Sequence, residues 1–208
     1  MIGFHDCLKR ARDISVSTRI RRVPMSFHNF SLIIERARPA AKRVLVGSDK
    51  LPVIAEAECI GYETNLLERV NKRREATASP SPHRRNDEGA SGLSSGSESR
   101  HAKRSEKWVE QAVDEILHLK ILESVIDAQE PSRIVLATGD AKEAEYSGGF
   151  LKMIERALLK GWQVEVISFR SNTSGAYRRK EFRAKWGPMF KWIQLDDFVE
   201  DLVSNEEG

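Results

Sequence analysis

The stretch that decides the fold runs from Arg133 to Phe169 and reads RIVLATGDAKEAEYSGGFLKMIERALLKGWQVEVISF. It opens with an apolar, β-branched run that ends in Thr138-Gly139-Asp140. An acidic loop follows, then an amphipathic helical pattern that stops at Gly161, and then a second apolar run. This order predicts a strand, a loop, a helix and a second strand parallel to the first. Asp140 would then lie at the carboxyl end of a strand, the edge at which open parallel sheets bind ligands.

The residues upstream repeat the alternation of helix and strand. Ser26 is a candidate N-cap for a helix that ends before Pro39. Residues 43–47 and 62–67 have the pattern of short strands, and residues 51–60 that of a short helix between them. The sequence therefore predicts the α/β class, with a parallel sheet of about four to five strands flanked by helices.

Two further expectations concern the second half of the chain. The apolar spacing from Trp108 to Ile121 predicts one long helix. After Phe169, we expect a polar loop and a basic segment, then a turn over residues 192–195 and a closing helix over 196–203.

Residues 72–104 break the alternating pattern. This segment holds eight Lys and Arg against four Asp and Glu, has no aromatic residue, and has Leu93 as its one large aliphatic residue. Such a segment cannot bury enough apolar surface to offset the entropy cost of ordering, so we predict a disordered insert. A solvated insert is the plain interpretation of its charge, and an RNA contact or phosphorylation element is the alternative. The insert would divide one domain into parts at 1–71 and 105–203, with a tail at 204–208.

Composition and motifs exclude several functional classes. The 34 Lys and Arg and 31 Asp and Glu leave a net charge of +3, which by itself says little about partners. No apolar run approaches the roughly 20 residues that cross a bilayer, and the first residues lack the apolar core of a secretory signal. We therefore expect no membrane partner and a cytoplasmic or nuclear location. The histidines and cysteines lack zinc-ligand spacing, and neither a P-loop nor a GxGxxG motif is present.

Carboxylates are the stronger candidates for chemistry. Asp140 ends a strand, Glu143 and Glu145 lie in the loop after it, and Glu110 and Asp114 lie one turn apart on the expected helix. Mg²⁺ or Mn²⁺ binds a few convergent carboxylate oxygens, and a pair of such ions can clamp a phosphodiester. Asp140 with Glu110 could supply part of such a site. The alternatives are a turn or cap residue for Asp140 and a solvated helix face for Glu110 and Asp114.

Cations and aromatic residues alternate between residues 170 and 192. The cations that we expect to contact nucleic acid are Arg170, Arg178, Arg179, Lys180 and Arg183. Cations follow phosphates and aromatic rings stack on bases, so this mixture is typical of proteins that bind single-stranded nucleic acid. The alternative is that the rings belong to the core, which we favour for Trp186 and Trp192.

Taken together, these motifs resemble the NYN domain, a branch of the PIN-like ribonuclease superfamily. Lys107-Trp108-Val109-Glu110 resembles the family's K-G-V-D, Thr138-Gly139-Asp140 its S-G-D, and Gly161 to Val166 its G-x-x-V strand start. The resemblance implies a PIN-like (Rossmannoid) parallel sheet and a metal-dependent endoribonuclease that cleaves single-stranded RNA. It also implies Asp140 and Glu110 as ligands of Mg²⁺ or Mn²⁺.

The chain departs from the family pattern in three places. Lys142 stands where the family has a second acid, so Glu143 or Glu145 would have to substitute, and Glu110 replaces the usual Asp. The family's central first strand, which ends in D-x-x-N, has no counterpart, so we expect the native protein to begin upstream of Met1.

Two other functions are alternatives, and the departures favour the first of them. A non-catalytic RNA-binding or scaffold module with the same fold is the alternative to an active ribonuclease. A phosphatase of the haloacid-dehalogenase type also carries T-G-D after a strand, but its chemistry needs a nucleophilic D-x-D motif, which the sequence lacks.

Overall fold

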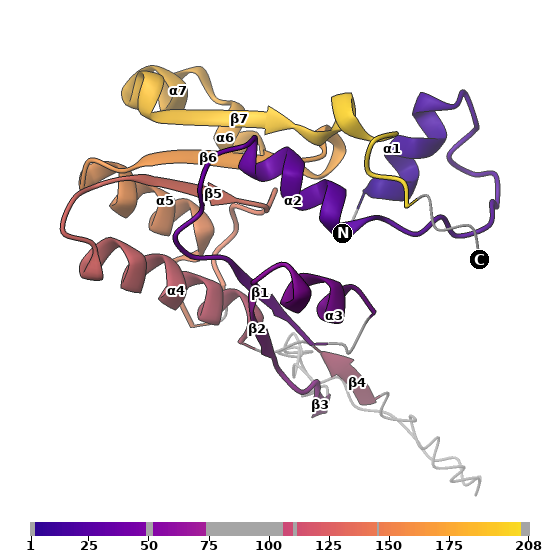
Figure 1. The fold of residues 1–208 in the computed structure, drawn as a ribbon, viewed down its shortest axis with the longest axis horizontal. Coiled ribbons are helices and arrows are strands. Elements are labelled where there is room, and N and C mark those ends of the chain that lie inside the picture. Colours follow the sequence, from indigo (N-terminus) through magenta and orange to yellow (C-terminus); the bar gives the residue numbers. More distant parts are fainter. Residues whose placement is uncertain (1–2, 49–51, 74–105, 110–111, 145, 205–208) are drawn as a thin grey trace, which may run out of the picture.

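The fold is that of a computed structural model, which describes residues 3–48, 52–73, 106–109, 112–144 and 146–204 (Figure 1). Its helices are α1 (Phe4–Ala11), α2 (Phe27–Glu35), α3 (Pro52–Cys59), α4 (Val113–Asp127), α5 (Gly149–Leu159), α6 (Gly175–Arg178) and α7 (Lys180–Trp186). Its strands are β1 (Val44–Gly47), β2 (Glu63–Leu66), β3 (Val70–Arg73), β4 (Glu106–Val109), β5 (Arg133–Leu136), β6 (Gln163–Ser168) and β7 (Phe190–Gln194). Parallel strands flanked by helices confirm the α/β class.

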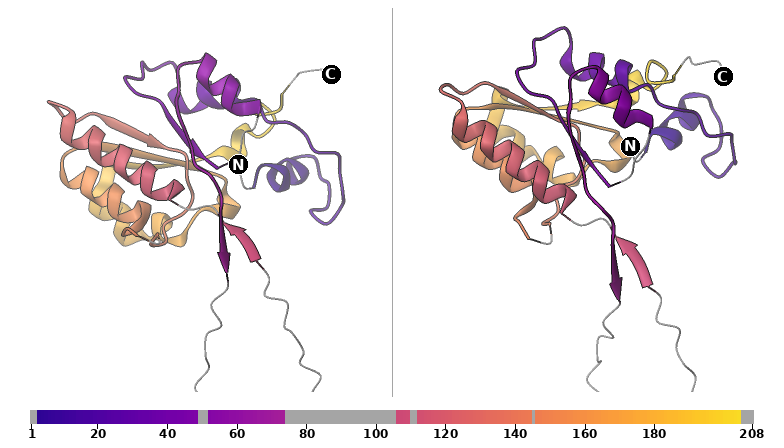
Figure 2. Two further views of the ribbon diagram at one scale, coloured as in Figure 1. Left: turned by 90° about the horizontal axis from the view of Figure 1, so that it is seen from below. Right: turned by 60° about the horizontal axis from the view of Figure 1, so that its bottom comes forward.

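Within the described residues the parallel strands form two small sheets instead of one. β1 pairs with β2, while β5, β6 and β7 form a three-stranded sheet with β6 in the middle. β3 and β4 form a separate antiparallel pair, which projects from the rest of the fold in both views of Figure 2.

Two apolar clusters hold the three-stranded sheet between its helices. One face of β6 places Val164 and Val166 against α4 and α5, where Phe150 and Ile154 are buried. The other face places Ile167 in a cluster with residues of α1, α2 and the C-terminal segment. The sheet is therefore covered on both sides, as expected for parallel strands.

The local signals that predicted several elements are visible in their contacts. The Ser26 side chain accepts a hydrogen bond from the Asn29 N–H at 3.1 Å and so caps α2, which ends before Pro39 as predicted. The helix predicted between the two apolar runs is α5, and Gly161, with a φ of 85°, follows it.

Three expectations about elements were wrong. The helix expected from Trp108 begins at Val113, because residues 106–109 pair in antiparallel register with β3 and Ala112 adopts a left-handed φ of 64°. The expected turn over 192–195 lies mostly in β7, which pairs with β6, and the expected closing helix is only a 3-10 turn (η3, Leu195–Phe198).

The predicted insert is ordered at its start, where Lys72 and Arg73 belong to β3. The expected disorder of residues 74–104 lies outside the described residues. No helix in the described part of the chain is both long and apolar enough to cross a membrane.

Candidate functional site

Asp140 lies just beyond the carboxyl end of β5, as predicted. Its side-chain Oδ1 accepts the Lys142 N–H at 2.9 Å, and its own N–H donates to Thr138 Oγ1 at 3.2 Å. The exposed carboxylate thus stabilises a local turn. The second oxygen of the Asp140 carboxylate, Oδ2, accepts no hydrogen bond from any residue that the structure describes.

The loop after Asp140 is attached to the start of α4. The Tyr146 N–H donates to Glu115 Oε1 at 3.1 Å, and His118 Nδ1 lies 2.7 Å from Ser147 Oγ. His118 is only 3% exposed. Burial lowers the pKa of His118, and the charges of Asp114 and Glu115 oppose this only in part. We call the turn at Asp140, this loop and the first turn of α4 the acidic edge.

Gly149 allows the start of α5 to pack against the backbone of the loop at Lys142. Its φ is 75°, and a Cβ added there would lie 1.9 Å from the Lys142 carbonyl oxygen. Only glycine permits both this conformation and this approach. Ser147-Gly148-Gly149 is therefore a tight helix entry turn packed against backbone.

The described carboxylates do not make a metal site by themselves. Oxygen donors of this type suit Mg²⁺ or Mn²⁺. However, no three His, Cys, Asp or Glu side chains of the described residues are grouped so that they could hold an ion. Asp140, Glu143 and Asp114 are described but not brought together as a ligand set, and the predicted ligands Glu110 and Glu145 lie outside the described residues.

Helix α6 is fixed directly against the acidic edge. The buried Tyr177 hydroxyl donates to the Asp140 carbonyl oxygen at 2.5 Å, and the Ser174 N–H donates to the Gly139 carbonyl at 2.8 Å. Burial, and secondarily the Asp140 charge, raise the pKa of Tyr177, so the hydroxyl keeps its proton. A Cβ on Gly139 would lie 2.3 Å from the Asn172 carbonyl oxygen, so the two loops meet backbone to backbone.

The five predicted nucleic-acid-binding cations are exposed on the segment that runs from residue 170 through α6 into α7. We call them the basic surface: Arg170, Arg178, Arg179, Lys180 and Arg183. All five are exposed, and none forms an ion pair with a carboxylate in the part of the chain that the structure describes. Lys180 and Arg183 also line a pocket of about 330 Å³ with Ala184, Gly187 and Phe190.

The aromatic residues between these cations belong to the core. Tyr177, Trp186 and Phe190 are buried, and the half-buried Trp192 donates its Nε1–H to Ser168 Oγ at 3.1 Å. The core assignment is confirmed for Trp186, whereas Trp192 is only partly buried and packs against the edge of the core. Tyr177, Trp186 and Phe190 are therefore packed inside, and Arg178 lies over the half-buried Trp192 ring at 6.0 Å. The surface thus presents cations suited to phosphate groups more than rings on which bases could stack.

Sequence reasoning missed the residues that position this region. The sequence patterns do not single out Tyr177, which anchors α6, nor His118 or Glu165. Glu165 did carry a signal, because it is the one charged residue within the apolar run of β6. A charge in such a run must find partners when it is buried.

Comparisons with known proteins do not assign a family. No protein-family model matches the chain, and neither does any curated protein. Among solved structures, a protein of unknown function from Vibrio parahaemolyticus is similar at a TM-score of 0.46 and 14% identity, over 97% of this chain and 92% of the other. A likeness this remote says nothing about function.

Proposed function

We propose that this protein binds single-stranded RNA through the basic surface and that the RNA backbone passes the acidic edge, where a metal-dependent endoribonuclease would cut it. The observation that carries this proposal is the hydrogen bond from the Tyr177 hydroxyl to the Asp140 carbonyl. It fixes α6, where the run of cations begins, beside the strand end that carries the candidate catalytic acid.

Charge supports a polyanionic partner. Between Gly175 and Trp192 the sequence has six Lys and Arg and one acid, Glu181. Cations without carboxylate partners bind phosphates by releasing counterions, which makes binding strong at low salt and weak at high salt. The resemblance to the NYN domain supports single-stranded RNA as the polyanion.

Cleavage would require carboxylates from residues that the structure does not describe. Asp140, Glu143 and Asp114 do not hold a metal ion by themselves, so Glu110 or Glu145 would have to complete a ligand set. An RNA-binding module without catalysis is the second candidate. It is favoured by the Asp140 carboxylate, which is already engaged by the Lys142 N–H.

Incubation of labelled single-stranded RNA with Mn²⁺ separates the two candidates. Asp140→Asn keeps the oxygen that accepts the Lys142 N–H but removes the charge. Asp197→Asn, at an exposed position on η3, is the matched control. Cleavage that is lost in EDTA and in Asp140→Asn, but kept in the control, would support the ribonuclease. RNA binding without cleavage would support the binding module, and absence of RNA binding would refute both.

A further inference from the structure

A second group of cations surrounds one buried carboxylate on the opposite face of the sheet from α4 and α5. Glu165, in the middle of β6, is 3% exposed and accepts hydrogen bonds from Arg36 and Arg38, and Arg133 Nε lies 3.5 Å from its Oε1. Burial by itself would raise the pKa of Glu165, but the Arg38 hydrogen bonds and the three positive charges outweigh it and lower the pKa. The carboxylate is therefore charged at neutral pH.

The positive charge of Arg38 is by itself enough to balance the negative charge of the Glu165 carboxylate. Its Nη1 and Nη2 donate to the two carboxylate oxygens at 3.1 and 2.8 Å, which is the bidentate geometry that guanidinium and carboxylate prefer. Its Nε and Nη2 also donate to the carbonyl oxygens of Glu35 and Ile34 at 3.0 and 3.3 Å. Arg38 is therefore a structural link between the end of α2 and the sheet.

Arg36 and Arg133 bring positive charge beyond what Glu165 needs. Their side chains are 40% and 36% exposed. Besides the contacts with Glu165, Arg133 donates to Gln163 Oε1, and the remaining guanidinium N–H groups of both residues have no other side-chain acceptor among the described residues. Two guanidinium groups thus contact the same carboxylate, and each has N–H donors that are not used by a side-chain acceptor of the described residues.

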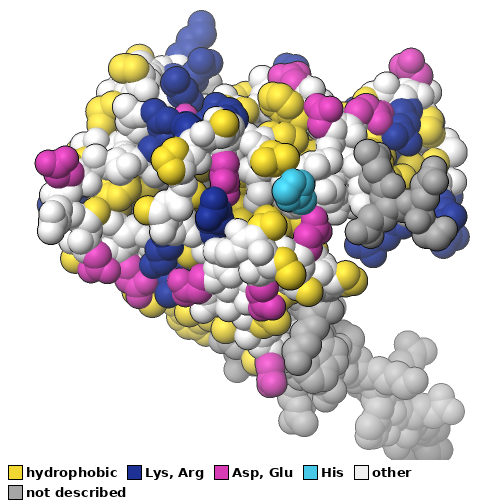
Figure 3. Space-filling model, in the orientation of Figure 1, with side chains coloured by type: hydrophobic (Ala, Val, Ile, Leu, Met, Phe, Trp, Pro, Cys, Tyr) yellow, Lys and Arg dark blue, Asp and Glu magenta, His cyan; other side chains and the backbone are white. Residues whose placement is uncertain are grey.

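The backbone holds Arg36 in place at an energetic cost. Arg36 and Ala37 have φ values of 50° and 56°, in the left-handed region that non-glycine residues rarely adopt. Lys191 pairs in register with Glu165, so it lies on the same face of the sheet and adds an exposed cation. Figure 3 shows Lys and Arg side chains gathered on this face, over the end of α2 and the adjoining strands.

We propose that Arg36 and Arg133 form a phosphate-binding site, positioned by Glu165 and Arg38, that takes a phosphate group of the bound RNA. The proposal rests on the proposed RNA binding and adds a second point of attachment at the end of β5 away from Asp140. Two guanidinium forks match the oxygens of a phosphate group, and the excess positive charge suits an anion. Arg36 and Arg133 are binding residues, whereas Glu165 and Arg38 are positioning residues.

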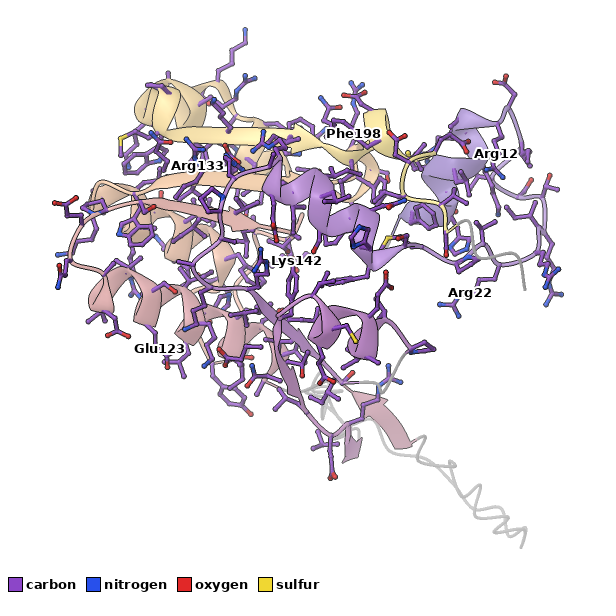
Figure 4. All side chains as sticks on the ribbon, in the orientation of Figure 1. Arg12, Arg22, Glu123, Arg133, Lys142 and Phe198 are labelled. Atoms are coloured by element: carbon purple, nitrogen blue, oxygen red, sulfur yellow. The ribbon has the colours of Figure 1, made fainter. Side chains whose placement is uncertain are left out.

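The test compares the affinity of labelled single-stranded RNA for four forms of the full chain over a range of salt concentrations. The site variant is Arg36→Gln with Arg133→Gln, which leaves Arg38 to neutralise Glu165. The control is Arg12→Gln with Arg19→Gln, which removes two exposed charges. In Figure 4, Arg12 and Arg133 lie well apart, with Arg12 at the right of the view and Arg133 left of its centre. The fourth form, Lys180→Gln with Arg183→Gln, tests the basic surface separately.

We expect the site variant to bind RNA roughly tenfold more weakly than the control. The slope of log affinity against log salt should become shallower by about 0.7 for the lost phosphate contact. Equal binding by the site variant and its control, with weakened binding in the Lys180 and Arg183 variant, would overturn this site alone. Failure of the unaltered protein to bind RNA would overturn the proposed function. Displacement of RNA by polyglutamate as readily as by polyphosphate would overturn the phosphate assignment in favour of an acidic peptide.

Discussion

At the scale of single residues, a few positions decide the shape of the acidic edge. Gly149 lets the loop approach the Lys142 carbonyl, and His118 ties the same loop to α4 through Ser147. The Asp140 side chain accepts the Lys142 N–H and so stabilises the turn after β5. Each of these contacts is local, so each can be tested by one substitution.

Gly149→Ala should lower the free energy of unfolding by about 2 kcal/mol or more, because the new Cβ meets backbone in a strained conformation. Urea unfolding measures this. Gly175→Ala is the control, since nothing lies within 4 Å of its added Cβ, and it should change stability by at most about 0.5 kcal/mol. Equal stabilities of the two variants would contradict the packing described for this loop.

The stability of the protein should fall as pH falls below 6.5 because of His118. Its folded pKa is lowered from 6.5 by burial, so below that pH the unfolded chain binds the proton more readily and stability is lost. Chemical unfolding at pH 7.5 and at about pH 5.5 tests this. His118→Leu should be less stable at pH 7.5, having lost the Ser147 bond, but should depend less on pH. An unchanged pH dependence in the variant would show that other groups cause it.

At the scale of elements, the position of α6 links the basic surface to the acidic edge. The parts of this region that could be predicted depend on local sequence: the apolar periods of β5, α5 and β6, and Gly161 as a stop. The strand β4 could not be predicted in this way. Its residues fit a helical pattern in isolation, and they form a strand because distant backbone groups in β3 pair with them.

Tyr177→Phe should lower the free energy of unfolding by about 1 kcal/mol and weaken RNA binding several-fold, because α6 loses its bond to the Asp140 carbonyl. Tyr62→Phe is a matched control. It also loses a side-chain hydrogen bond, at 2.7 Å to Ser31, but it does so away from the basic surface. Thermal unfolding and RNA titration of both variants test the claim. RNA affinity that falls equally in both would mean that stability, and not the position of α6, controls binding.

At the scale of the whole molecule, the chain arranges its parallel strands in two small sheets. Cations without carboxylate partners among the described residues lie at α6–α7, and three arginines share the single carboxylate of Glu165. The α/β class could be predicted because helix and strand periods alternate along the sequence. The division into two sheets could not be predicted, because which strands pair with each other depends on contacts between segments that are distant in the sequence. Asp140 could be placed from its strand end, whereas the cluster at Glu165 joins three separate segments, which no local spacing reveals.

The measurement that tests the central claim most directly is the salt dependence of single-stranded RNA binding by the unaltered protein and by Lys180→Gln with Arg183→Gln. Both substituted residues are exposed and line one pocket, so the fold should persist. We predict that the unaltered protein binds RNA at low salt and releases it as salt rises, and that the variant binds roughly tenfold more weakly with a shallower salt slope. No binding at low salt, or equal binding by both proteins, would contradict the assignment of this surface to RNA.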